Sequence, residues 1–260
     1  MSIVLPVLIF AGMGLAAGIL LTAASSYFAV ESDPTMERIT EALPGANCGS
    51  CGFAGCADYA QAIADGKAEP NLCKPGGAEA AAKIGEILGK NVTAAEPEVM
   101  AIHCNGTCDA TGSFYDYRGT PTCRAAAANF GGSGMCSFGC LGFGDCMAVC
   151  EENAICLKDG IAHIIEERCL ACGRCAAACP KGLLSLRPKS NPVTAACSSK
   201  ASGKDTKLAC KNGCIGCKIC EKKCPNGAIT VQELHAVIDY TKCTGCGICA
   251  DACPVKVIHK

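Results

Sequence analysis

The sequence predicts an α+β protein that begins with a transmembrane helix and continues as several small cysteine-rich units. Three observations lead to this prediction. The first 30 residues contain a long apolar run, the next 60 hold a group of four cysteines, and regularly spaced cysteine runs recur afterwards. Only 5% of the 260 residues are aromatic and 26 are cysteine, so we expect bonds between thiolates and metal to supply much of the folding energy.

Residues 1–30 are expected to form a membrane anchor. Ile3–Ala24 has no charged residue and would extend over about 33 Å as a helix, which is enough to cross a bilayer. Gly14 and Gly18 offer a small face for packing against another membrane helix. A cleaved signal peptide is the alternative. No Lys or Arg precedes the apolar run, however, which favours an uncleaved single-pass helix.

Residues 31–90 are expected to form a small domain around one metal centre. Met36, Ile39 and Leu43 have helical spacing, and Pro44 follows them as a helix breaker. The cysteines of this segment are Cys48, Cys51, Cys56 and Cys73. Four thiolates suit one [4Fe–4S] cluster. A structural zinc ion is the alternative, because the spacing is not that of a ferredoxin.

Residues 91–130 are expected to connect this domain to the next. They contain Cys104, Cys108 and Cys123, which have no obvious fourth partner. Cys156, Cys197 and Cys210 are also left without an assignment. Two interpretations stay open: a sixth cluster that uses Cys104, Cys108 and Cys123, or thiols that are buried or idle. No histidine follows a C-x-x-C pair, so attached haem is not expected.

Residues 131–188 are predicted to form an altered 2[4Fe–4S] ferredoxin module. Cys169-x2-Cys172-x2-Cys175-x3-Cys179-Pro is the bacterial ferredoxin run, whose fourth cysteine holds the neighbouring cluster. The run before it is stretched, as Cys136-x3-Cys140-x5-Cys146-x3-Cys150. One cluster is therefore expected on Cys136, Cys140, Cys146 and Cys179. The other is expected on Cys150, Cys169, Cys172 and Cys175.

Residues 189–207 are rich in Ser, Lys and Ala and are expected to be a polar linker. Residues 208–260 then contain two regular ferredoxin runs. Disulfides or zinc would not need cysteines in this pattern. The predicted ligands are Cys214, Cys217, Cys220 and Cys253 for one cluster, and Cys224, Cys243, Cys246 and Cys249 for the other. Cys150 and Cys224 each lie nineteen residues before the next run (150 to 169 and 224 to 243), which indicates a duplicated module.

The net charge of −1 conceals an asymmetry along the chain. Residues 31–110 hold 12 acids and 5 bases, whereas residues 199–260 hold 5 acids and 10 bases. A basic end favours an acidic partner, although clusters bound by thiolates are themselves anionic. Nothing in this pattern indicates nucleic acid.

The phrase Glu41-Ala-Leu-Pro-Gly-Ala-Asn-Cys-Gly-Ser-Cys-Gly-Phe-Ala-Gly-Cys56 lies behind the predicted anchor and ahead of the ferredoxin modules. In this arrangement it closely resembles the RnfB family, one of the subunits of the Rnf complex, an ion-translocating ferredoxin oxidoreductase of prokaryotic membranes. The resemblance implies a component of a translocase. The cysteine motifs themselves predict at least five [4Fe–4S] clusters, with a sixth left open, and because these must be loaded, we expect the cluster-bearing part to lie on the cytoplasmic side of the membrane. By the resemblance, the chain would accept electrons from reduced soluble ferredoxin and relay them to other integral and peripheral subunits, which reduce NAD or another acceptor while Na+ or H+ moves.

No residue of this sequence is predicted to act as a proton-transferring catalyst, so the cluster ligands themselves form the expected site. Two other functions fit the same motifs. The chain could be a polyferredoxin subunit of a different membrane reductase or hydrogenase, or a scaffold stabilised by zinc. Iron and sulfide analysis distinguishes the zinc-stabilised scaffold from the two functions that need iron–sulfur clusters.

Overall fold

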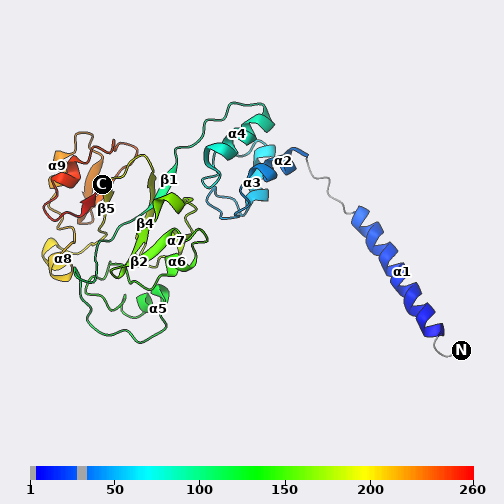
Figure 1. Ribbon diagram of the computed structural model, residues 1–260, viewed down its shortest axis with the longest axis horizontal. Helices are drawn as coiled ribbons and strands as arrows, with labels where there is room; N and C mark the ends of the chain where they lie inside the picture. Colours follow the sequence, from blue (N-terminus) through cyan, green and yellow to red (C-terminus); the bar gives the residue numbers. More distant parts are fainter. Residues whose placement is uncertain (1–3, 28–33) are drawn as a thin grey trace.

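The computed structural model describes residues 4–27 and 34–260 (Figure 1). The helices are α1 (Val4–Tyr27), α2 (Pro34–Ala42), α3 (Cys56–Ala64), α4 (Gly77–Leu88), α5 (Cys123–Ala128), α6 (Asp145–Ala148), α7 (Arg174–Ala178), α8 (Gly203–Ala209), α9 (Ile219–Lys223) and α10 (Ile248–Asp251), with one 3-10 turn, η1 (Glu166–Arg168). The strands are β1 (Glu98–Ile102), β2 (Ile155–Lys158), β3 (Ile161–Ile164), β4 (Leu184–Pro188), β5 (Thr194–Ala195), β6 (Ile229–Gln232), β7 (His235–Ile238) and β8 (Ile258–His259). This mixture confirms the predicted α+β class.

Helix α1 has the length and composition of a membrane span. The window Val7–Ala24 has a mean hydropathy of 2.2, and none of it is buried against the rest of the protein. Phe10 and Leu20 are 73% and 70% exposed. A helix that is apolar on all sides needs a protein core or lipid around it, so α1 fits the predicted anchor.

Helices α2, α3 and α4 form a small helical unit, which lies between α1 and the strands in Figure 1. Ile39 of α2, Tyr59 and Ile63 of α3 and Ile84 of α4 make its core, and each is at most 3% exposed. The Tyr59 hydroxyl donates to the carbonyl of Glu69 at 2.7 Å, which satisfies the one polar atom of this buried ring.

Two modules follow, and their strands pair in the same way. In the middle module β1 pairs with β4, and β2 forms a hairpin with β3. In the C-terminal module β5 pairs with β8, and β6 forms a hairpin with β7. All four pairs are antiparallel. In each module the first and last strands pair with each other, and the hairpin comes between them in chain order.

This pairing changes two of the expected boundaries. The segment 91–130 was expected to be a connection, yet it supplies β1, which is the first strand of the middle module. The segment 189–207 was expected to be a polar linker, yet it contains β5 and most of α8. Val193 is fully buried and Ser199 is 2% exposed. Tertiary packing has overridden a polar composition here.

A pair of glycines shows how closely the two modules correspond. Gly142 follows Cys140 by two residues and Gly216 follows Cys214 by two, and both have a positive φ, of 72° and 66°. A Cβ at Gly142 would lie 2.6 Å from a backbone oxygen of the β2–β3 turn. A Cβ at Gly216 would lie 3.0 Å from a backbone oxygen of the β6–β7 turn. Only glycine allows this approach in both modules.

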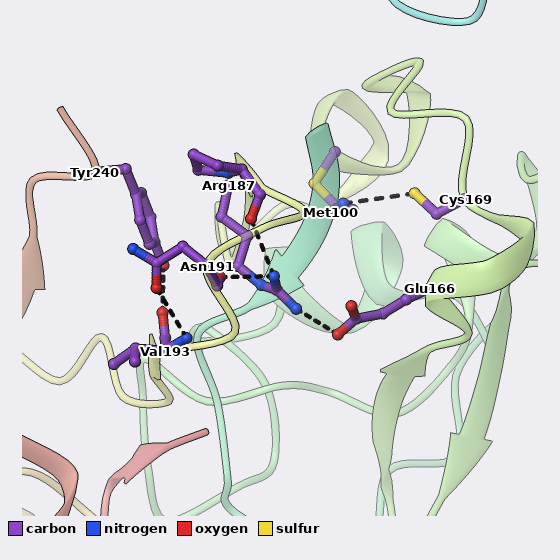
Figure 2. A network of polar contacts seen from close by, with 8 residues as sticks. Met100, Glu166, Cys169, Arg187, Asn191, Val193 and Tyr240 are labelled. Atoms are coloured by element: carbon purple, nitrogen blue, oxygen red, sulfur yellow. Dashed lines mark hydrogen bonds and ion pairs between the residues drawn. The ribbon is translucent and has the colours of Figure 1, made fainter. Parts of the chain in front are cut away.

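The segment after β4 ties the two modules together, as Figure 2 shows. Arg187 is 3% exposed, and its guanidinium donates to the Glu166 carboxylate and to the carbonyl of Asn191. A buried charge needs such partners. The Asn191 side chain in turn donates to the carbonyl of Cys243, in the C-terminal module, at 3.1 Å.

Candidate iron–sulfur sites

All 26 cysteines lie in the described part of the chain as free thiols. Within that part, no three or more His, Cys, Asp or Glu side chains are gathered closely enough to hold a single metal ion. The second, third and fifth sets described below each line a cavity, and the thiols of the first and fourth sets lie near one another. A zinc ion would draw its sulfurs to about 2.3 Å from one point, whereas a [4Fe–4S] cluster is held by four separate thiolates.

The first set belongs to the helical unit. Cys56 begins α3, and its backbone N–H, which has no partner within the helix, donates to the Asn47 side chain at 2.8 Å. Burial raises the pKa of the Cys73 thiol, and the nearby thiols of Cys56, Cys51 and Cys48 raise it further. All four predicted ligands of this unit therefore lie near one another.

The second set lines a cavity beside α7. It comprises Cys150, Cys169, Cys172 and Cys175, the four residues predicted to share a cluster. The Met100 backbone N–H reaches across from β1 to the Cys169 sulfur at 3.5 Å (Figure 2).

This second cavity also meets the helical unit. Cys48, a member of the first set, lines it as well. Arg174 of α7 donates to the carbonyl of Ala46 at 2.8 Å and forms an ion pair with Glu151. The first and second sets are therefore neighbours.

The third set differs from the prediction in one member. Cys140, Cys146 and Cys179 line a common cavity, but the fourth cysteine there is Cys123 and not Cys136. In a regular run two residues separate successive ligands of the first three, whereas five separate Cys140 from Cys146. The span from Cys140 to Cys146 equals that from Cys214 to Cys220, but Phe143 occupies the position of the middle cysteine. Cys123, at the start of α5, lies at this cavity in its place.

The position of α5 depends on Asp145. Its carboxylate accepts hydrogen bonds from the backbone N–H groups of Cys123 and Arg124, at 2.8 and 3.0 Å. These donors are at the start of α5, where N–H groups have no partner within the helix. Because Cys146 is the next residue, Asp145 connects two cysteines of the third set. The sequence contains no motif that would reveal this link.

The fourth and fifth sets lie in the C-terminal module and agree with the predicted ligands. The fourth comprises Cys214, Cys217, Cys220 and Cys253. Burial raises the pKa of Cys220 to about 11, and its three nearby partners contribute. The fifth lines a cavity beside α10 and comprises Cys224, Cys243, Cys246 and Cys249.

Backbone donors place Cys150 and Cys224 in equivalent positions. The Cys150 sulfur accepts from the N–H of Ala154 at 3.3 Å, and the Cys224 sulfur accepts from the N–H of Ala228 at 3.3 Å. The acceptor and donor are four residues apart in both cases. The equivalence inferred from the sequence therefore extends to the hydrogen bonds.

A further cavity lies between the two modules. Among the residues that line it are Cys104, Cys136, Cys140, Cys197 and Cys210. The sequence offered Cys104, Cys108 and Cys123 as a set, but the structure does not bring them together. Cys104 is at this cavity and Cys123 is in the third set, whereas Cys108 is exposed. Cys156 is exposed too, and neither Cys108 nor Cys156 lines a cavity described above.

Burial sets the protonation of several thiols in the metal-free chain. It raises the pKa of Cys104 and of Cys146 to about 11, and that of Cys175 to about 12. These groups are then neutral thiols near pH 7. Because iron binds the thiolate, cluster insertion must release these protons, and the binding energy contributes to folding.

Comparison with known proteins gives the same organisation. Residues 43–75 match an Fe-S cluster family, residues 162–185 a 4Fe-4S binding domain, and residues 213–257 a 4Fe-4S dicluster domain. The chain is 44% identical over 235 residues to the RnfB-type component of the ion-translocating oxidoreductase complex of Methanosarcina acetivorans, covering 90% of this chain and 89% of that protein.

Two further relatives are named for the ion that their complexes move. The RnfB-type component of the Na(+)-translocating ferredoxin:NAD(+) oxidoreductase complex of Acetobacterium woodii is 41% identical, over 93% of this chain and 73% of that protein. Its counterpart in the proton-translocating ferredoxin:NAD(+) oxidoreductase complex of Clostridium ljungdahlii is 37% identical, over 92% of this chain and 84% of that protein.

Proposed function

Because the chain belongs to the RnfB family of ion-translocating oxidoreductase complexes, we propose that it carries electrons from reduced ferredoxin to other subunits of such a complex. The family membership confirms the resemblance drawn from the phrase Glu41–Cys56. Two relatives are named as components of ferredoxin:NAD(+) oxidoreductases, which supports ferredoxin as donor and NAD as the final acceptor of the complex.

The electron-carrying groups are [4Fe–4S] clusters, each of which takes up and releases one electron when bound. Five ligand sets are assigned to them here. They are Cys48, Cys51, Cys56 and Cys73; Cys150, Cys169, Cys172 and Cys175; Cys123, Cys140, Cys146 and Cys179; Cys214, Cys217, Cys220 and Cys253; and Cys224, Cys243, Cys246 and Cys249. The second and third sets also touch, since Cys146 and Cys175 share one hydrophobic core.

The chain's own contribution is to hold, space and tune these groups. Backbone N–H groups donate to ligand sulfurs, as Ala154 does to Cys150 and Ala228 does to Cys224. Hydrogen bonds to sulfur and burial are the means by which a protein sets cluster potentials. The observation that carries the proposal is this series of four-cysteine sets, several of which lie beside the next.

We place the cluster-bearing units on the cytoplasmic side of the membrane, with α1 as a single-pass anchor. Cluster assembly needs reduced thiols, which the cytoplasm maintains. The segment Ile3–Ala24 contains no ionisable residue. Ion pathways through membranes use such residues, so Na+ or H+ is expected to cross through other subunits.

The test uses the full chain in its complex, purified without oxygen. Cys150→Ser is expected to lower the iron content by about four atoms, since one cluster loses a ligand. It should also slow ferredoxin-dependent NAD reduction by about tenfold or more, measured as NADH absorbance. Cys156→Ser is the matched control, because this exposed thiol lies six residues away and in no ligand set.

The control should keep both its iron and its rate. Electron transfer by the Cys150→Ser complex at the wild-type rate would contradict the proposed function. Loss of about four iron atoms in Cys156→Ser would instead contradict the ligand assignment.

A further inference from the structure

The cavity between the two modules is lined by four cysteines that belong to none of the five assigned sets. They are Cys104, Cys136, Cys197 and Cys210. Cys104 and Cys210 are 8% and 6% exposed, and the other two are partly buried. In sequence they lie outside the regular ferredoxin runs and outside the segments that match family models.

These four residues are two matched pairs, one from each module. Cys104 follows the end of β1 by two residues, and Cys197 follows the end of β5 by two. Cys136 precedes Cys140 by four residues, and Cys210 precedes Cys214 by four. The duplicated modules thus contribute the same two positions to one cavity.

The backbone repeats this correspondence. Just after β1, the N–H of His103 donates to the carbonyl of Leu183 at 2.7 Å. Just after β5, the N–H of Ala196 donates to the carbonyl of Val257 at 2.8 Å. The backbone therefore has equivalent hydrogen bonds after β1 and after β5, and Cys104 and Cys197 lie at the same cavity.

The sulfurs at this cavity accept backbone hydrogen bonds in matching positions. Gly106 donates to Cys104 at 3.4 Å, and Ser199 donates to Cys197 at 3.5 Å, each from two residues downstream. Such donors stabilise the negative charge of a thiolate that holds a cluster. A buried group of four thiols with these donors has the composition of a [4Fe–4S] site.

We propose that Cys104, Cys136, Cys197 and Cys210 hold a sixth [4Fe–4S] cluster, placed between the middle and C-terminal modules. The inference deepens the proposed function, on which its role as an electron carrier rests. It also accounts for the four cysteines that the regular motifs leave over, so that only Cys108 and Cys156 stay outside every set.

The site is in direct contact with a ligand of a neighbouring cluster on each side. The N–H of Cys140, from the third set, donates to the Cys104 sulfur at 3.3 Å. The N–H of Cys214, from the fourth set, donates to the Cys197 sulfur at 3.2 Å. The sixth cluster therefore connects the two ferredoxin modules, which would otherwise be separate pairs of clusters.

The decisive experiment leaves the proposed site untouched. The double variant Cys108→Ser/Cys156→Ser keeps 24 of the 26 cysteines, which is the number that six clusters with four ligands each require. Native mass spectrometry of the anaerobically purified protein then counts the clusters in the most fully loaded species. Six clusters are expected, and they would make every remaining cysteine a ligand by elimination. Five clusters in this variant and in the wild type would overturn the proposal.

Single variants identify the ligands directly. Cys197→Ser and Cys210→Ser are each expected to lose one cluster, which is about four iron and four sulfide atoms, while the other five are retained. Retention of the full wild-type iron content by either variant would also overturn the proposal. If a variant loses more than one cluster through misfolding, the double-variant count still decides. Failure here is distinct from failure of the proposed function, which is measured by electron transfer from ferredoxin.

Discussion

Asp145 illustrates how a single side chain can complete a proposed cluster site without being one of its ligands. Its carboxylate accepts two N–H groups at the start of α5 and so holds Cys123 beside Cys140 and Cys146. A charged acceptor at a helix start also interacts favourably with the helix dipole. A hydrogen bond to a charged group contributes about 1.5–3 kcal/mol, and two of them hold this six-residue helix.

We therefore expect Asp145→Ala to destabilise the third cluster while the other clusters stay bound. The measurement is the rate of iron release to a chelator, together with total iron. Release of about four iron atoms should become faster, or these atoms should be absent on purification. Asp116→Ala is the control, because the Asp116 carboxylate is 78% exposed and pairs only with the exposed Arg118 among the described residues. Equal iron release from both variants would rule out this role for Asp145.

At the scale of elements, the regular cysteine runs could be predicted because their ligands are close in sequence. A loop with two residues between ligands leaves little freedom, so Cys214, Cys217 and Cys220 can be assigned from spacing alone. Cys123 and Cys136 could not be placed in this way. Their positions depend on α5 and on the meeting of two modules, which are tertiary contacts. One signal was nevertheless present, since Cys136 and Cys210 each precede a first ligand by four residues.

The folded structure of the polar segment 189–207 could not be predicted for a related reason. Its composition favours a linker, but Ser199 and Thr206 satisfy each other by a hydrogen bond of 2.9 Å between their buried hydroxyls. Buried polar groups are tolerated when they are paired. Pairing depends on the fold and cannot be inferred from composition.

Helix α1 gives a prediction at this scale. Deletion of residues 1–28 is expected to release a soluble protein that keeps its brown colour, because α1 is the one described helix that is long and apolar enough to cross a membrane. Fractionation of cells that lack the other subunits measures this. Recovery of the shortened protein in the membrane fraction would show that another surface also binds the membrane.

For the whole molecule, charge separates the two ends of the series of sites. In Figure 1 the helical unit lies toward α1 and the C-terminal module lies on the far side of the middle module. The C-terminal module presents exposed lysines around its first run, at Lys211, Lys218, Lys222 and Lys223. Cys217 and Cys246 of its two sets are also exposed. This end is therefore open to a soluble partner that carries negative charge.

Charge reversal tests whether ferredoxin docks at these lysines. Lys218→Glu/Lys222→Glu/Lys223→Glu is expected to slow reduction by ferredoxin by about tenfold at low salt and much less at high salt, because steering by exposed charges is screened. Stopped-flow loss of visible absorbance measures the rate. A small chemical donor should reduce both proteins equally.

The matched control reverses three exposed lysines elsewhere, Lys158, Lys204 and Lys207. It changes the net charge by the same amount and should slow ferredoxin less. Equal slowing by both triple variants would mean that net charge, rather than this surface, governs the encounter.

The cavity between the two modules also constrains the time at which the protein can mature. Cys48 to Cys73 are synthesised within one short segment, so the first site is complete early in translation. Cys104 and Cys136 emerge next but must remain unpartnered until Cys197 and Cys210 leave the ribosome. During that interval, about ten seconds at ordinary rates of synthesis, half of the proposed sixth site is present in the nascent chain. The proposed site can therefore be completed only after synthesis of the second module has begun, so we expect the junction between the modules to be the last part of the middle module to mature.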